Sequence, residues 1–174
     1  MKKLLFIVNN RAGKTRSRSP LYDAIACFSR SGYLVSVHET QGPGDATQTV
    51  HDHGAQFDLI VCAGGDGTLN ETITGLMTLE ERPPLGYLPN GSTNDFAASL
   101  HIPANLVEAA LIASDGTPTP LNIGIHNDRY FAYVASFGAF TRASYSVPQE
   151  TKNALGHFAY ILQGVKDLDS LRPY

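Results

Sequence analysis

The first thing that this sequence lacks is an excess of basic residues. Its 13 lysines and arginines are outnumbered by 16 aspartates and glutamates, so the formal net charge is −3 and the pI is near 6.0. The phosphates of a nucleic acid are bound by a positive electrostatic field, which this balance does not supply. We therefore predict that nucleic acid is not a partner.

Long apolar runs and disulfide-type cysteine patterns are missing as well. The first apolar run ends at Val8 without the small-residue cleavage pattern of a signal peptide, and no run approaches the ~20 residues that cross a bilayer. The two cysteines, Cys27 and Cys62, lie inside apolar patterns, which is typical of buried thiols in a reducing compartment. These absences predict a cytoplasmic protein that meets a membrane only peripherally.

The pattern that is present is an alternation of strands and helices. Strands are expected at residues 4–8, 33–37, 57–61 and 85–88, and helices at 19–32, 42–53 and 68–79 and again from Asn94 and Asn105. This alternation predicts an α/β fold, a parallel sheet with helices on both faces, whose ligands bind beyond the carboxyl ends of the strands.

The character of the chain changes after a turn at residues 116–120. Two strands are expected at residues 121–125 and 130–135, joined by Asn127 and Asp128, and a helix at residues 151–168. We predict one α/β domain at residues 1–120 and a partial, β-rich second domain at residues 121–174.

Three glycines and an aspartate follow the third predicted strand, in the stretch Gly64-Gly65-Asp66-Gly67-Thr68. Glycines let the backbone approach a ligand closely, and the amino end of the next helix favours an anion such as phosphate. Asp66 would repel phosphate unless a cation lay between them, which favours Mg²⁺. A structural explanation stays open, in which the turn needs unusual backbone angles and Asp66 is a helix cap.

Two further loops fall at strand ends. The stretch at residues 9–15 contains "GKT", but the glycine that a Walker A loop needs five residues earlier is replaced by Val8. Its backbone amides, Arg11 or Lys14 could still meet phosphate. The stretch "GYLPNGSTNDFA" at residues 86–97 carries more polar residues than one helix cap needs, so both glycine-containing loops are expected to face one ligand.

With "GGDGTLNE" and "LPNGSTNDFA" both present, the chain resembles the bacterial diacylglycerol kinase family, soluble lipid kinases whose catalytic domain is shared with sphingosine and ceramide kinases. "NNRAG", "GPGDA", "LNIGIHNDRYFAYVASFG" and "TKNALGHFAYILQGV" extend the resemblance over nearly the whole chain. GGDGT alone also occurs in the related loops of NAD kinases and phosphofructokinases. The combination with the second loop separates the family from them.

The resemblance implies an enzyme of lipid metabolism that transfers the γ-phosphoryl group of ATP, with Mg²⁺, to the hydroxyl of a lipid such as diacylglycerol. Asp66 would organise the metal and charge network and would contact the metal indirectly. The nucleotide contacts carried over by position are Asn9, Asn10, Arg11, Ala12, Gly13, Thr40, Gly65, Asp66, Gly67, Thr68, Leu69, Asn70, Glu71 and Ser92. A homodimer and transient contact with a membrane are left open.

The chain departs from the family pattern at three positions. Asn10 replaces the usual proline and Ser92 the usual threonine, whereas Asn122 stands where the family has an aspartate of the charge network. The general base of the family lies in a β-sandwich that would follow residue 174, so we expect this stretch alone to be inactive. Two alternatives therefore stay open: a nucleotide-binding module without catalysis, and a kinase for a soluble acceptor such as NAD.

Overall fold

The computed structural model describes residues 1–9 and 19–133 of the chain, and Met1–Tyr133 cluster as one compact unit. Its frame is a four-stranded parallel sheet in the order β2-β1-β3-β4. The strands are β1 (Lys2–Val8), β2 (Tyr33–Glu39), β3 (Leu59–Gly64) and β4 (Leu85–Pro89). The helices are α1 (Ser19–Arg30), α2 (Asp45–His53), α3 (Asp66–Leu76), α4 (Asp95–Ser99) and α5 (Leu106–Asp115). The predicted α/β fold is confirmed.

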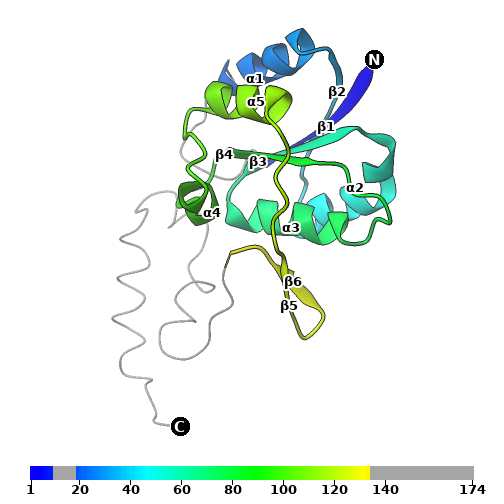
Figure 1. Cartoon of the computed structure of the whole chain (residues 1–174). Coiled ribbons are helices and arrows are strands. Elements are labelled where there is room, and N and C mark those ends of the chain that lie inside the picture. Colours follow the sequence, from blue (N-terminus) through cyan, green and yellow to red (C-terminus); the bar gives the residue numbers. More distant parts are fainter. Residues whose placement is uncertain (10–18, 134–174) are drawn as a thin grey trace. The chain divides into compact units, whose positions relative to one another are not determined.

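Helices cover both faces of the sheet (Figure 1). On one face α1 and α5 pack over a core that contains Phe6 and Phe28, whose rings meet edge to face at 5.4 Å. On the other face α2 and α3 pack over Ile7 and Ile60. Because successive residues of β1 and β3 face opposite cores, these strands are continuous apolar runs. Cys62, fully buried in β3, has its pKa raised to about 12 by burial.

Three predicted boundaries around the glycine-rich stretch were wrong. The third strand begins at Leu59, because Gly54–Gln56 form a 3₁₀ turn, and it continues to Gly64, which pairs with Pro89. The next helix begins at Asp66, not Thr68, because the extended residue Gly65 already serves as its N-cap. The errors at the end of the strand and the start of the helix have one cause: pairing with β1 and β4 carries the strand through small residues that sequence alone assigns to a loop.

The predicted hairpin exists but is shorter than expected. Strands β5 (Gly124–His126) and β6 (Arg129–Phe131) pair antiparallel across Asn127 and Asp128. Both turn residues have positive φ, 46° and 63°, as a two-residue hairpin turn requires. The predicted helix at 151–168 and most of the proposed second domain lie outside the described residues, and the boundary near residue 120 stays a prediction.

Within the part of the chain that the structure describes, the helices are too short or too polar to cross a lipid bilayer.

Close packing between α2 and α3 depends on Gly75. A Cβ atom at this position would lie 2.6 Å from the Thr47 carbonyl oxygen and 2.7 Å from the Val50 Cβ atom. We predict that Gly75→Ala lowers the free energy of unfolding by about 1–3 kcal/mol, because the two helices must separate. Urea denaturation measures this. Gly67→Ala, a matched control in the same helix with nothing within 4 Å, should leave stability unchanged or raised.

Candidate functional site

Three predicted site residues, Asn9, Thr40 and Gly65, lie at one edge of the sheet. Asn9, Thr40, Gly65 and Asn90 are the first residues after β1, β2, β3 and β4. Since all of these strands are parallel, their carboxyl ends meet at the same edge. The backbone hydrogen bonds between neighbouring strands continue past the strand ends. The Thr40 N–H donates to the Val8 carbonyl at 2.9 Å, and the Asn90 N–H donates to the Gly64 carbonyl at 2.8 Å.

Asn9 links the loop after β1 to the connection between β3 and α3. Strand order β2-β1-β3-β4 places the topological switch point between β1 and β3, where ligands of such sheets bind. Asn9 lies at this point. Its N–H donates to the Ala63 carbonyl at 2.9 Å, and its Nδ2 donates to Thr68 Oγ1 at 2.9 Å. The side chains of two predicted ligand residues are therefore already held together.

The glycines of the stretch at residues 64–67 differ in what surrounds them. A Cβ at Gly64 would lie 2.7 Å from the Thr68 side chain, so this glycine makes room for Thr68. A Cβ at Gly65 would lie 3.3 Å from the Gly91 Cα, so this glycine lets the two loops approach each other. A Cβ at Gly67 would meet nothing within 4 Å. None of these glycines has a positive φ, so unusual backbone angles do not explain them.

Among the residues that the structure describes, no side chain caps the amino end of α3. The Leu69 N–H donates to the Gly65 carbonyl at 3.0 Å, whereas the amides before it precede the first intrahelical hydrogen bond. The Leu69 side chain lies in the core, and Asn70 and Glu71 are half-buried on the following turn. An anion at this end of α3 would be bound by backbone amides and the helix dipole more than by side chains.

Asn94 shapes the loop between β4 and α4. It adopts the left-handed conformation (φ 56°, ψ 47°) before α4, and its side chain accepts from the Gly91 N–H at 2.9 Å and donates to the Gly91 carbonyl at 3.0 Å. The Tyr87 hydroxyl lies 3.3 Å from Asn94 Oδ1 and 3.2 Å from the Gly64 carbonyl. Burial, reinforced by nearby Asp66, raises the pKa of Tyr87, so its hydroxyl keeps the proton that it donates.

The carboxylate of Asp66 joins the loop after β3 to the loop after β4. One oxygen accepts from the Asp95 N–H at 3.1 Å and the other from the Phe96 N–H at 3.2 Å. Asp66 is thus a cap, as the structural explanation anticipated, but it caps α4 and not its own helix. A carboxylate oxygen has more than one acceptor position, so this contact leaves capacity for a cation.

Ser92 carries the unsatisfied group of the site. Its Oγ is buried and has no hydrogen-bond partner among the described residues. The residue follows Gly91, whose Cα borders the Gly65 backbone, so this hydroxyl lies in the loop beside the amino end of α3. A buried hydroxyl without a partner costs folding free energy, and a bound ligand that accepts its proton would recover it.

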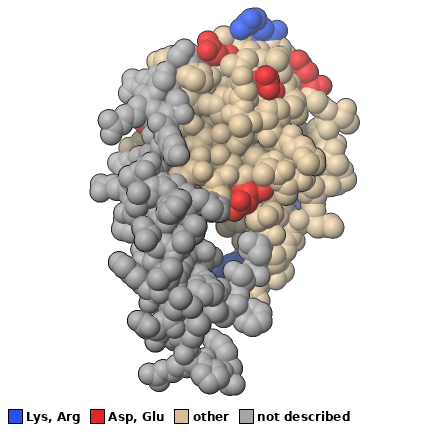
Figure 2. All heavy atoms as spheres, turned by 90° about the vertical axis from the view of Figure 1, so that its left-hand side faces the viewer, with Lys and Arg blue, Asp and Glu red and all other residues tan. Residues whose placement is uncertain are grey.

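Charged side chains are scattered over the part of the described surface that Figure 2 shows. Acidic groups there are separated by neutral areas, and a basic group stands at the top edge. Among the described residues, no set of three or more His, Cys, Asp or Glu side chains could hold a metal ion. A divalent cation at this edge would therefore need the ligand itself to complete its coordination.

Asn10, Arg11, Ala12 and Gly13 lie outside the described residues. Asn122 is exposed in the segment between α5 and β5.

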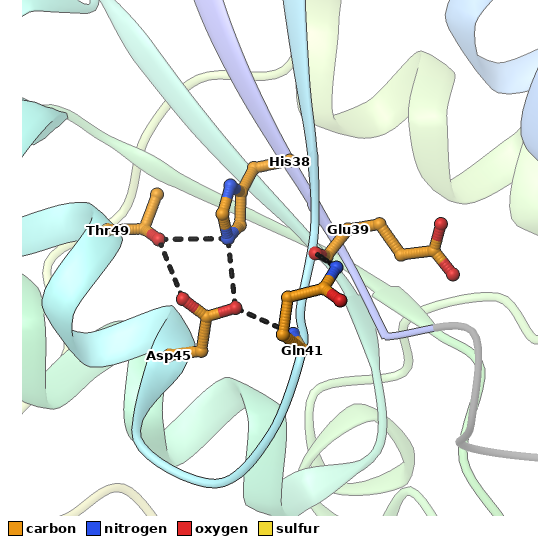
Figure 3. A network of polar contacts seen from close by, with 5 residues as sticks. All are labelled: His38, Glu39, Gln41, Asp45 and Thr49. Atoms are coloured by element: carbon orange, nitrogen blue, oxygen red, sulfur yellow. Dashed lines mark hydrogen bonds and ion pairs between the residues drawn. The ribbon is translucent and has the colours of Figure 1, made fainter.

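Sequence reasoning missed a polar network beside Thr40 (Figure 3). Asp45, the first residue of α2, accepts from the Gln41 N–H at 2.6 Å and lies 3.1 Å from His38 Nε2. Thr49 Oγ1 completes the cluster, 3.0 Å from the same histidine nitrogen. The backbone hydrogen bond from Gln41, aided by His38, holds the pKa of Asp45 below its usual value. The network fixes the loop between β2 and α2.

Residues 3–125 match the family model described as the diacylglycerol kinase catalytic domain. The chain belongs to this family. It is 41% identical over 175 residues to a diacylglycerol kinase of Bacillus subtilis, covering 99% of this chain and 58% of the relative. It is 37% identical over 172 residues to a diacylglycerol kinase of Staphylococcus epidermidis, covering 98% of this chain and 54% of the relative.

The fold of the family is shared by solved structures. A crystal structure of a diacylglycerol kinase from Bacillus anthracis superposes with a TM-score of 0.70 at 33% identity, covering 75% of this chain and 45% of that one. The chain therefore spans little more than half the length of the curated relatives that it matches.

The loop network predicts a pH-dependent stability. Because the folded pKa of Asp45 is lowered, its stabilising effect is complete above the ordinary value of 3.8 and is lost as the pH falls through the folded value. Asp45→Asn should lower the free energy of unfolding by about 1–2 kcal/mol at pH 7. Urea denaturation at pH 7 and at an acidic pH below 3.8 should find a smaller difference at the acidic pH.

Asp52→Asn is the matched control on the same helix. Asp52 is exposed, and among the described residues it accepts only from the Gln48 side chain, at 2.9 Å, so its substitution should change stability little at either pH. Equal destabilisation by Asp45→Asn at both pH values would contradict the proposed role of the carboxylate charge.

Proposed function

We propose that the chain is the nucleotide-binding part of an ATP- and Mg²⁺-dependent lipid kinase, which transfers the γ-phosphoryl group to the hydroxyl of diacylglycerol or a related lipid. The observation that carries this proposal is the uncapped amino end of α3 beside the unpartnered Ser92 hydroxyl. The names of the relatives add the lipid acceptor.

The arrangement fits a bound phosphate in shape and in chemistry. The space beyond Gly67 is open, so an oxygen of the ligand can approach the first turn of α3 where a side chain would block it. The amides of this turn would donate to the phosphate oxygens, and Ser92 Oγ would donate one more hydrogen bond. Asn9 and Thr40 border the same edge.

Each polar residue has a role in this proposal. The hydrogen bond between Asn9 and Thr68 holds the loop after β1 at a fixed separation from the amino end of α3. Asp66 fixes the loop after β4 by accepting from the Asp95 and Phe96 amides. Its oxygens keep acceptor capacity for a cation bound with the nucleotide. Mg²⁺, when bound with the nucleotide, would neutralise the charge that develops on the phosphate oxygens.

Two substitutions should separate nucleotide binding from stability. Ser92→Ala removes a hydroxyl that has no partner among the described residues, so stability should stay within about 1 kcal/mol or rise. The affinity for ATP with Mg²⁺ should fall roughly tenfold, because a hydrogen bond to a charged oxygen is lost. Gly67→Ala places a methyl group in the open space and should weaken binding further, again without loss of stability.

Isothermal titration calorimetry and urea denaturation measure the two effects. Ser92→Thr is the control, because it keeps the hydroxyl and should keep most of the affinity. If both alanine variants bound ATP as tightly as the wild type, the nucleotide site would have to lie elsewhere.

The acceptor is tested with the whole protein. ADP formation that depends on diacylglycerol vesicles supports the lipid kinase, whereas ADP formation with NAD in their place supports the soluble acceptor. Tight ATP binding with neither activity, unrestored by Asn122→Asp, would support the module without catalysis.

A further inference from the structure

The loop after β4 begins with a chemically labile pair of residues. Asn90 is followed by Gly91, and this is the only place in the sequence where glycine follows asparagine. Asparagine is one of the thermolabile residues of proteins, because the backbone nitrogen of the next residue can attack its side-chain amide. A glycine in that next position has no Cβ atom to obstruct the attack. A spontaneous reaction is therefore expected here before it is expected at any other asparagine.

The side chain of Asn90 is available for this reaction. The residue is half-buried, and among the described residues its side-chain amide has no hydrogen-bond partner. Its backbone is held in place, because the Asn90 N–H donates to the Gly64 carbonyl at 2.8 Å. The part of the chain that the structure describes therefore holds the backbone of this residue but leaves its amide group free.

The Gly91 nitrogen, in contrast, is restrained by Asn94. Asn94 Oδ1 accepts from the Gly91 N–H at 2.9 Å, and Asn94 Nδ2 donates to the Gly91 carbonyl at 3.0 Å. The backbone nitrogen attacks only when its proton is removed, and a hydrogen bond from the N–H to an acceptor stabilises the protonated form. The Asn94 side chain therefore slows the attack.

We propose that Asn90 and Gly91 form a deamidation site, at which Asn94 sets the rate of the reaction. The Gly91 nitrogen forms a bond to Cγ of Asn90, and the bond from Cγ to Nδ2 breaks. Ammonia leaves with the proton of the Gly91 nitrogen, and a cyclic succinimide remains. Water then opens the ring at either carbonyl and returns a proton to the nitrogen, so the products are aspartate and isoaspartate. No oxidant or reductant takes part.

Both products disturb the contact between the loops after β3 and β4. A Cβ atom at Gly91 would collide with the Gly65 Cα, so the backbone has no free space there. Isoaspartate lengthens the backbone before Gly91 by one carbon atom, which forces Gly91 out of this contact. Aspartate keeps the length of the backbone but adds a negative charge at position 90.

The consequence for ligand binding rests on the proposed function. Asn90 and Gly65 are the first residues after two neighbouring strands, whose backbones lie about 4.8 Å apart. A carboxylate at position 90 would therefore lie close to the amides at the amino end of α3, where we propose that phosphate binds, and would repel the phosphate. Deamidation would thus produce a form of the chain that binds nucleotide more weakly.

Peptide mass spectrometry measures the reaction in the whole, folded chain at physiological temperature and mildly alkaline pH. Asn90 should convert before every other asparagine. In Asn94→Gly, which tolerates the left-handed φ of 56°, Asn90 should convert roughly tenfold faster, because the hydrogen bond of the Gly91 N–H is lost. Asn94→Asp keeps an acceptor oxygen and should stay near the wild-type rate.

Asn105→Gly is the matched control for a general loss of stability. Asn105 Oδ1 accepts from the Val107 N–H at 2.9 Å at the start of α5, so this variant loses a comparable hydrogen bond in another loop. The rate at Asn90 should not change. Equal acceleration by Asn94→Gly and Asn105→Gly would overturn the proposal, because unfolding of the chain would then set the rate. Faster conversion of another asparagine in the wild type would overturn it as well.

Calorimetry with ATP and Mg²⁺ tests the consequence for binding. Asn90→Asp reproduces one product, and its affinity should fall roughly tenfold below that of the wild type. Asn90→Gln keeps a neutral amide and should keep the affinity. Equal affinities of these two variants would refute the proposed consequence. A wild-type chain that binds no ATP would contradict the proposed function, whereas the mass measurements would still decide the reaction at Asn90.

Discussion

The pairing of β1 with β3 is the constraint on which the rest of the site depends. It makes these two strands parallel neighbours, so that the residues after them meet at one edge of the sheet. The hydrogen bonds from Asn9 to Ala63 and Thr68 exist only because of this pairing. Once the edge is formed, the amino end of α3 points its amides at the same place.

Contacts between the loops after β3 and β4 also fix the shape of this edge. Gly65 and Gly91 approach so closely that neither position tolerates a side chain without rearrangement, and Asp66 reaches across to the amides of Asp95 and Phe96. The loops therefore support one another and do not need a ligand to fix their shape. Preorganisation of this kind favours binding, because less conformational entropy is lost when the ligand arrives.

Much of the architecture could be predicted from the sequence because its signals are local. Apolar runs, glycines and turn residues such as Asn127 and Asp128 act over a few residues, and the family motifs were recognisable as short strings. The end of β3 could not be predicted, since Ala63 and Gly64 are weak strand formers that pairing with β1 and β4 holds extended. The cluster of His38, Asp45 and Thr49 was also missed, because its members come from different elements.

The sequence by itself determined the fold class, the family and which loops carry the polar residues, because each depends on the order and spacing of residues along the chain. Only the tertiary structure decided what each residue touches. Asp66 was recognisable as a carboxylate in a phosphate-type loop, yet its partners are the amides of a helix that begins near residue 95, and no local pattern encodes that distance. The same holds for the Ser92 hydroxyl, whose lack of a partner follows from the packing of two loops.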